Sequence, residues 1–247
     1  MTAPTPQIVQ AFAPTGALRA SINLGNPILA GRDPATQAPA GVSVDLARAL
    51  AERLGVGIEL VVFEKAAQSV DAVRSEKADV GFFAIDPARS EGLRFTAPYV
   101  LIEGSYLVPV ASALQDNAAV DRAGTRIGVA SGSAYDLFLS RELKSAAIER
   151  RLLAPDVIDA LRRGEVEVAA GIRQQLEAVA RADAGLRMLP GRFMVIQQAM
   201  GLPAGRGETA AGFLAEFVEA MKAGGFVAEA LARHRIEGAG VAPPAGQ

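Results

Sequence analysis

The side chain best suited to bind a charged partner is Arg89, which follows an apolar, strand-like segment and a turn containing proline. Ligands of α/β proteins bind at the carboxyl ends of strands, so we expect this guanidinium at a sheet edge of that kind. A guanidinium there can hold a carboxylate with two parallel hydrogen bonds. The alternative from these residues alone is an exposed ion pair with Asp86 or Glu91, which contributes at most about 1 kcal/mol.

A second candidate anion site is the segment 131–133, Ser-Gly-Ser, at an expected junction between a strand and a helix. Its small residues are expected to leave backbone N–H groups free at a helix N-terminus, and the hydroxyls of Ser131 and Ser133 are further donors. The alternative is a plain N-cap formed by Ser133, worth about 1 kcal/mol, and the two roles are compatible.

The composition excludes several kinds of catalysis. The chain has no Cys and one His, His234. Thiolate chemistry and Cys-containing zinc sites are therefore excluded, as is a Ser-His pair unless His234 takes part. His234 lies between two arginines near the C-terminus, where we expect a solvated helix end. We expect no metal, no cofactor and no catalytic residues.

Length and charge narrow the class of protein. The 247 residues are 50% hydrophobic, which is enough for one large or two small domains with a real core. With 25 basic and 27 acidic side chains there is no basic stripe for nucleic acid. Apolar runs fall far short of the roughly 20 residues of a spanning helix, so we expect no membrane insertion. We also expect a monomer.

The first residues lack the basic and apolar regions of a secretory signal. A periplasmic location is therefore expected if an export signal has been removed, and a cytoplasmic one otherwise.

The strands and helices that must position these residues are expected in the same order in both halves of the chain. In the first half we expect strands at 18–23, 57–63 and 78–85 and helices at 43–54 and 67–75, with Ser43 as an N-cap. In the second half we expect strands at 126–130, 148–153 and 166–171 and helices at 133–141 and 155–163. The order β-α-β-α-β implies a parallel sheet with right-handed crossovers, so the chain contains two α/β units.

The remaining segments suggest how the two units are connected. Strand-like stretches lie at 93–99, 104–110 and 193–198, and helices are expected at 208–223 and 226–235. If the second unit is inserted into the first, the chain crosses between lobes near 107–111 and 194–199, and these crossings form a hinge. We therefore expect residues 1–107 and 199–247 in one lobe, residues 110–194 in the other, and a cleft between them.

Five segments occur in the order and spacing of the bacterial family 3 extracellular solute-binding proteins, which nearly the whole chain resembles. They are GVSVDLARALAERLG at 41–55, ADVG at 78–81, IDPAR at 85–89, FTAPY at 95–99 and GVASGS at 128–133. The resemblance implies an α/β, two-lobed periplasmic-binding-protein type II fold, with two Rossmann-like lobes joined by two hinge strands, that closes on a small ligand. It also implies an ABC permease as a possible partner, because the family comprises receptors of polar amino-acid ABC transporters.

The resemblance places the family's carboxylate-binding arginine at Arg89. In the family's amino-acid receptors an Asp on the last strand of the second lobe accepts the ligand's ammonium, and Ile172 occupies that position here. Phe82 and Ala84 replace the polar partners that are frequent there. The resemblance therefore implies that the anion clamp is kept and the ammonium clamp is lost.

The expected ligand is a small organic anion, or an amino-acid-like molecule, with an apolar or aromatic body. Asn26, in the place of the family's usual aromatic wall, would line that body together with Phe82 and Tyr135. Each of these three side chains could equally be ordinary packing. The expected function is a solute-binding protein that feeds an ABC transporter.

Two other functions stay open. Cyclohexadienyl dehydratases are similar overall and would need a general acid, for which the acidic candidates are Glu103, Asp136, Glu165 and Glu167. Their spacing forms no recognisable acid–base pair, so we expect no enzyme. A ligand-sensing domain of a larger receptor is the other alternative.

Overall fold

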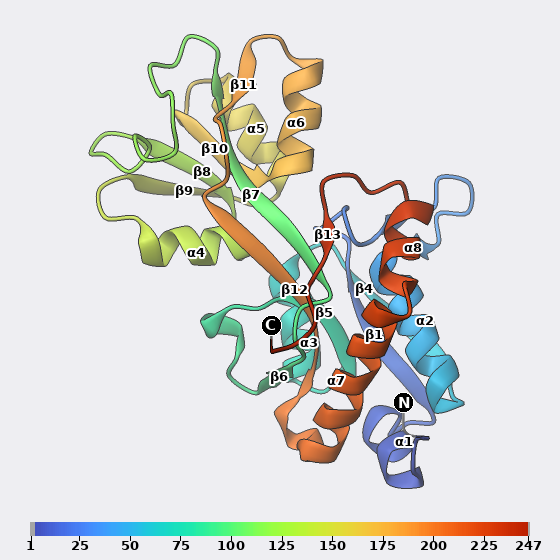
Figure 1. Ribbon diagram of the computed structural model, residues 1–247. Helices are drawn as coiled ribbons and strands as arrows, with labels where there is room; N and C mark the ends of the chain where they lie inside the picture. The colour runs from blue at the N-terminus through green and yellow to red at the C-terminus, as the bar shows by residue number, and fades with distance from the viewer. Residues whose placement is uncertain (1–2, 247) are drawn as a thin grey trace. The chain divides into compact units, whose positions relative to one another are not determined.

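The computed structural model describes residues 3–246 and consists of two compact α/β units. Unit 1 comprises Met1–Leu101 and Gln197–Gln247, and unit 2 comprises Ile102–Ile196. The chain enters unit 2 along β7 (Val100–Pro109) and leaves it along β12 (Met194–Pro203) (Figure 1). The expected repetition of an α/β unit is confirmed, whereas the predicted lobe limits and hinge positions stay predictions.

The sheet of unit 1 is built around three parallel strands. β1 (Ala17–Asn23) lies between β4 (Gly57–Phe63) and β5 (Val80–Ala84), with Ala20 opposite Val80. β12 continues the sheet antiparallel to β5, and β6 (Leu93–Phe95) pairs with β12. Two short pairings complete the unit: β2 (Gly31–Arg32) with β3 (Pro39–Ala40), and β13 (Gly240–Val241) with β7.

Helix α2 (Val42–Leu54) begins and ends where its sequence directs. Its buried side chains include Val44, Ala47, Leu50 and Leu54, one turn apart, so they form a single apolar stripe. Gly55 ends the helix in the left-handed conformation, with φ of 70°. The N-cap is Gly41, so the prediction that Ser43 caps this helix was wrong. The Ser43 N–H instead donates to the carbonyl of Leu29, which holds the preceding loop against the helix.

The described part of unit 1 contains four further α-helices. They are α1 (Pro6–Phe12), α3 (Ala66–Arg74), α7 (Gly207–Ala223) and α8 (Phe226–Arg233). Of these, α3 packs against β1, β4 and β5. His234 follows α8, and its Nε2 lies 2.8 Å from Oδ2 of Asp45 on α2. The expected solvated helix end is therefore a partly buried contact between two helices, which lie side by side in Figure 1.

Unit 2 has the order β7-β10-β8-β9, with β8 (Arg126–Ala130), β9 (Ala147–Arg151) and β10 (Val168–Ile172) parallel. β7 runs antiparallel to β10 and also pairs with β11 (Leu186–Met188). The helices are α4 (Ala134–Glu142), α5 (Ala154–Arg162) and α6 (Arg173–Ala182). Sequence reasoning missed α6, because polar and charged residues dominate this helix and Leu176 is its one buried side chain.

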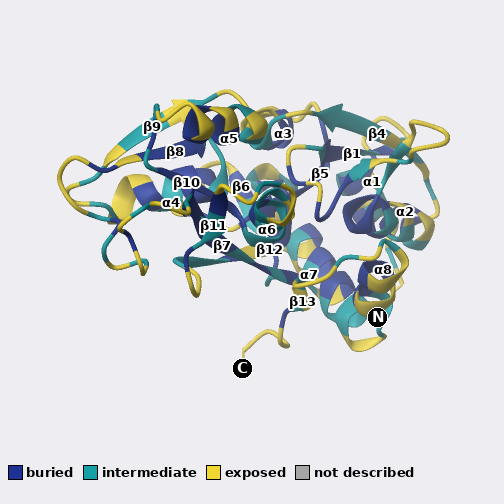
Figure 2. Cartoon of the chain, turned by 90° about the horizontal axis from the view of Figure 1, so that it is seen from above, coloured by how far each residue is buried: buried dark blue, intermediate teal, exposed yellow. Residues whose placement is uncertain are grey.

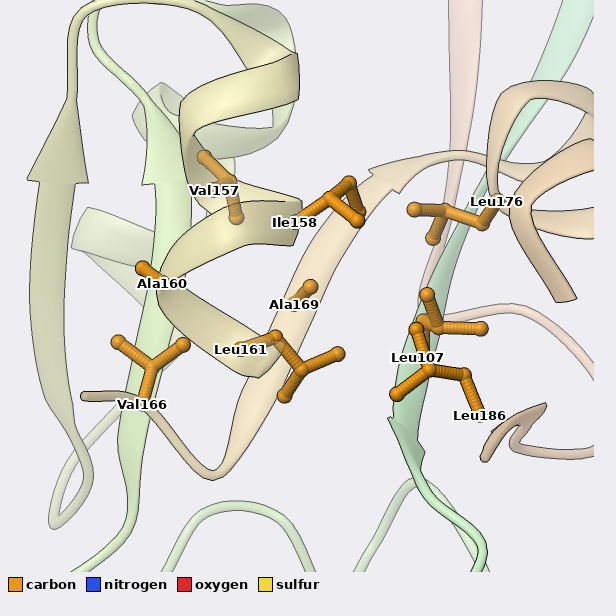
Figure 3. Close-up of a cluster of buried hydrophobic side chains, with 9 residues drawn as sticks. All are labelled: Leu107, Val157, Ile158, Ala160, Leu161, Val166, Ala169, Leu176 and Leu186. Carbon is orange, nitrogen blue, oxygen red and sulfur yellow. The ribbon is translucent and has the colours of Figure 1, made fainter. Parts of the chain in front are cut away.

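Side chains of α5, α6, three strands and the segment before β10 form the core of unit 2 (Figure 3). Its members are Leu107, Val157, Ile158, Ala160, Leu161, Val166, Ala169, Leu176 and Leu186. In Figure 2 the buried residues follow the strands and the inner faces of the helices in both units.

Candidate functional site

Arg89 lies at the end of β5, in a short 3-10 turn (Pro87–Arg89) capped by Asp86. Oδ1 of Asp86 accepts a 2.8 Å hydrogen bond from the N–H of Ala88, and its carbonyl accepts from the N–H of Arg89. Arg89 is only 5% exposed, and its Nη1 donates to the carbonyl of Ala84 at 3.2 Å. Arg89 is therefore not an exposed side chain, although Asp86, one of the two partners that the alternative supposed, acts electrostatically on its guanidinium.

Burial lowers the pKa of Arg89 to about 10, although the nearby Asp86 opposes the shift and Arg74 adds to it. The side chain still carries its charge at neutral pH, so the protein maintains a buried cation at the sheet edge. Burying a charge is unfavourable unless anions or hydrogen-bond acceptors compensate it. A carboxylate that reached this guanidinium would relieve part of that cost.

Neighbouring residues of β5 divide between the two faces of the sheet. Phe83 packs in a cluster with residues of α3, whereas the ring of Phe82 lies 6.2 Å from that of Tyr99 in an edge-on contact. The Tyr99 hydroxyl in turn lies 3.4 Å from Oγ of Ser43. Phe82 and Ala84 are both buried, so for Phe82 the packing interpretation has a specific partner, and Ala84 holds Arg89 through its carbonyl.

Asn26 lies in the loop that follows β1, and it is 9% exposed. Its carbonyl accepts hydrogen bonds from the N–H groups of Leu29 and Ala30, which fixes the backbone of the loop. Its side-chain Oδ1 is enclosed and has no hydrogen-bond partner among residues 3–246. Because β1 and β5 are parallel neighbours, the loops that carry Asn26 and Arg89 leave the same edge of the sheet.

In unit 2 the backbone of segment 131–133 is already engaged. The N–H of Ser131 donates to the carbonyl of Arg151 at 2.9 Å, and that of Ser133 donates to Ala130 at 3.1 Å. The N–H of Gly132 donates to Oδ2 of Asp136 at 2.8 Å. The expectation that these amides stand free was therefore wrong for the structure as it is described.

Asp136 is only 4% exposed and is bound from several sides. Arg150 contacts both of its carboxylate oxygens through Nε, at 3.0 and 3.1 Å, and the hydroxyl of Ser140 also reaches Oδ1. Ser133 is the N-cap of α4, where its Oγ accepts from the N–H of Asp136. Of the predicted donors in this segment, the hydroxyl proton of Ser131 remains for a ligand, because the Ser133 side chain also hydrogen bonds with Tyr135.

Sequence reasoning overlooked the role of Asp136, although a signal was present. The spacing Ser133-x-x-Asp136 resembles a capping box, in which the third helical residue reaches back to an N–H group before the helix. Here the acidic side chain reaches Gly132 rather than the cap residue itself.

Tyr135 and Ile172 are both buried in unit 2. Burial raises the pKa of Tyr135 to about 12, while hydrogen bonding with the Ser133 side chain opposes the shift.

Ile172 ends β10 opposite Gly104 of β7. The next residue, Arg173, donates to Glu103 at 2.6 Å and to Glu177 at 2.8 Å. The end of β10 therefore presents an aliphatic side chain followed by a paired cation.

The four acidic candidates for catalysis are all held by basic partners. Hydrogen bonds from Arg192 and Arg173 lower the pKa of Glu103. Arg163 and Arg151 lower the pKa of Glu165, and Arg126 does so for Glu167. Asp136 is bound by Arg150, as described above. A general acid for neutral pH needs a raised pKa, so the three glutamates are shifted in the wrong direction.

A hollow of about 260 Å³ lies between α5 and α6 of unit 2. Its walls are mostly apolar, and Arg162 is the one cation that lines it. Both Nε and Nη1 of Arg162 donate to aspartates, Asp183 and Asp159 respectively. This hollow is therefore a weaker candidate for a carboxylate ligand than the sheet edge of unit 1.

Two negative findings apply to the described residues. Residues 3–246 contain no cluster of three or more His, Cys, Asp or Glu side chains that could hold a metal ion. Within the same range, no helix has the length and apolar character needed to cross a membrane.

The chain matches the model of the family "Bacterial extracellular solute-binding proteins, family 3" over residues 29–233. A search of curated proteins gives no significant match. Among solved structures, the chain is similar to the solute receptor for L-cysteine of Neisseria gonorrhoeae, with a TM-score of 0.78 and 23% identity over 93% of this chain and 94% of that one.

Two further solved structures bear on the alternatives. An amino acid ABC transporter substrate-binding protein from Streptococcus pneumoniae, bound to L-arginine, has a TM-score of 0.76 and 17% identity over 91% of this chain and 97% of that one. An ancestral amino acid-binding protein, a precursor of cyclohexadienyl dehydratase, has a TM-score of 0.73 and 18% identity over 91% of this chain and 98% of that one. At these identities the likeness establishes a shared fold and nothing finer.

Proposed function

The chain belongs to the bacterial extracellular solute-binding proteins of family 3 and has their two-lobed type II periplasmic-binding-protein fold, and on this basis we propose that it is a receptor for a small carboxylate. The observation that carries the proposal is the buried guanidinium of Arg89 at the carboxyl end of β5. Such a group offers parallel donors to a carboxylate in a setting where water competes poorly.

The segment 131–133 of unit 2 is not proposed to bind the ligand's carboxylate. Asp136 occupies the Gly132 amide, so a ligand anion bound there would have to displace a buried carboxylate. We therefore assign the ligand's carboxylate to Arg89, with the hydroxyl of Ser131 as a neutral donor. Tyr135 and Ile172 would line the ligand's apolar body, as would Phe82 beside Ala84.

The ligand class follows from the lack of an acidic group at Ile172. A buried ammonium without a counter-charge is costly, and 1.4 kcal/mol already corresponds to a tenfold change in affinity. Relatives bind amino acids, as the L-cysteine receptor and the L-arginine complex illustrate. For this chain we propose carboxylates, or amino-acid-like molecules, whose recognition does not depend on an ammonium group.

The cellular role that we propose is capture of this solute outside the cytoplasmic membrane and delivery to an ABC permease. Closure of the two lobes on the ligand would couple binding to delivery, because a ligand that contacts both lobes favours the closed state. Support for this role comes from family membership and from a relative described as an ABC transporter substrate-binding protein.

The experiment that tests the proposal begins with protein purified without refolding. Native mass spectrometry would detect a ligand that is retained, and a thermal-shift screen of organic acids would follow. A ligand at about 100 times its dissociation constant stabilises the protein by about 2.7 kcal/mol. We expect carboxylates to raise the melting temperature and the matching amides or alcohols, which lack the anion, to leave it unchanged. Stabilisation by cations or neutral sugars alone would refute the proposal.

A dehydratase is the second candidate, because an ancestral precursor of such an enzyme shares the fold. The paired state of Glu103, Glu165 and Glu167 speaks against a general acid among them. Incubation of the identified ligand with the protein, followed by proton NMR, separates the two functions. We expect the ligand to be recovered unchanged, and formation of a dehydrated product at a rate proportional to protein concentration would favour the enzyme.

A further inference from the structure

Several buried side-chain atoms of unit 1 have no hydrogen-bond partner among the described residues, and one of them is the amide oxygen of Asn26. Asn26 is nine-tenths buried, and its Oδ1 has no hydrogen-bond donor within the described residues. Buried amide oxygens are nearly always paired, because an unpaired one forfeits its hydration without replacement. This exception needs a physical reason.

A loosely placed loop is not that reason. The carbonyl of Asn26 accepts from the N–H groups of Leu29 and Ala30, and Leu29 in turn is bound by the N–H of Ser43 in α2. On the other side, a Cβ at Gly25 would lie 2.7 Å from the carbonyl oxygen of Glu64. The backbone is therefore fixed at both flanks of Asn26, and its amide can adjust only by turning about its own bonds.

Simple packing is not a sufficient reason either. A leucine of similar size would fill the same volume without an unpaired oxygen, so packing alone would favour the apolar residue. An amide kept at such a position is expected where a bound molecule completes its hydrogen bonds. Asn26 fits this description, because its loop leaves the same sheet edge as the turn that carries Arg89.

We propose that Asn26 is a specificity-determining residue that selects carboxylates bearing a second, neutral group able to donate a hydrogen bond, such as a carboxamide or a hydroxyl. The inference rests on the proposed binding of a carboxylate at Arg89. A neutral group fits because the Asn26 amide is itself uncharged. Asp86, the carboxylate of the neighbouring turn, already accepts from Ala88 and lies in the field of Arg89.

Matched pairs of acids test this selection by calorimetry on the full chain. Succinamate and levulinate have the same shape, but only succinamate has an N–H donor. The pair 4-hydroxybutanoate and pentanoate differs in the same way through a hydroxyl group. We expect the wild-type protein to bind the donor-bearing member of each pair at least about tenfold more tightly. In Asn26→Leu the preference should fall below about twofold, whereas Gln68→Leu, at an exposed amide on α3, should keep it.

The melting temperature of the ligand-free variants is a second readout that needs no ligand. If Oδ1 is unpaired, Asn26→Leu should leave the melting temperature unchanged or raise it. A fall of several degrees would show that the amide has a partner, such as an ordered water, and would overturn the inference. Equal affinities within both pairs for the wild-type protein would also overturn it.

The two proposals fail in different ways. If acids bind and depend on Arg89 but show no preference for the donor, only the role of Asn26 is wrong. If no acid of either pair or of the wider screen binds the wild-type protein, the carboxylate receptor itself is refuted, and the selection by Asn26 falls with it.

Discussion

The carboxylate of Asp136 accepts a 2.8 Å hydrogen bond from the backbone N–H of Gly132. The protein thus places one of its own anions where the sequence suggested an anion site for the ligand. Arg150 and Ser140 also donate hydrogen bonds to this carboxylate, and Arg150 donates to Ser140, so the position of the Asp136 side chain is fixed. These hydrogen bonds stabilise the backbone at the end of β8. Arg89 is therefore the residue that we propose to bind the ligand's carboxylate.

Replacement of Asp136 by Ala should therefore weaken the fold more than the ligand site. We expect Asp136→Ala to lower the free energy of unfolding by about 1 to 3 kcal/mol, because it removes several hydrogen bonds to a buried group. Affinity for the ligand should change less than about threefold. Chemical denaturation and calorimetry measure the two effects, with Glu142→Ala at the end of the same helix as the control. A large change in affinity with unchanged stability would show that this segment binds the ligand's anion.

The lowered pKa of Arg89, about 10, predicts how affinity depends on pH. A carboxylate binds the charged guanidinium, so affinity should stay constant up to about pH 9 and fall as the pH rises through 10. The unfolded chain keeps this proton to a higher pH than the folded chain does, so above about pH 10 the Arg89 contribution to stability rises with pH. Loss of affinity there would therefore not reflect unfolding caused by Arg89. Calorimetry at increasing pH measures the affinity, and circular dichroism at the same pH values checks that the protein stays folded. An affinity that is unchanged up to pH 11 would contradict the prediction.

Selectivity against the α-ammonium group is the third prediction. With Ile172 at the end of β10, deaminated acids should bind at least about tenfold more tightly than the amino acids from which they derive. Titration with the twenty amino acids beside their deaminated analogues measures this. Ile172→Asp should shift the preference towards the amino acids, and Ile172→Val should not. If the wild-type protein binds an ordinary amino acid with a sub-micromolar dissociation constant and the deaminated analogue less tightly, the predicted selectivity is wrong. The protein would then bind its ligand as common amino-acid receptors do.

The elements that carry Arg89 were predictable because their signals are local. The apolar stripe of α2 and the glycine that ends it lie within one segment, and β5 is a continuous buried run. The turn after β5, with its proline, then places the arginine at the sheet edge. The order of strands and helices predicted two α/β units, and the resemblance of five segments to the family 3 proteins predicted the two-lobed fold.

Other features depend on partners that are distant in the chain. The N–H of Ser131 donates to the carbonyl of Arg151 in β9, and no residue of the segment 131–133 predicts this contact. The burial of Asn26 likewise arises from a loop that is fastened to α2 through Leu29 and Ser43. Helix α6 was missed for a different reason, because polar and charged residues dominate it and Leu176 is its one buried side chain.

The central claim, that a carboxylate binds to Arg89, is tested most directly by calorimetric titration of the identified acid into the wild-type protein, Arg89→Ala and Arg89→Lys. Loss of a desolvated charge partner should cost about 2 to 5 kcal/mol of binding free energy in Arg89→Ala. Arg89→Lys should restore only part of it, because an ammonium lacks the planar fork. Arg32→Ala, at an exposed ion pair of unit 1, should bind like the wild type. An unchanged dissociation constant in a folded Arg89→Ala protein would contradict the account.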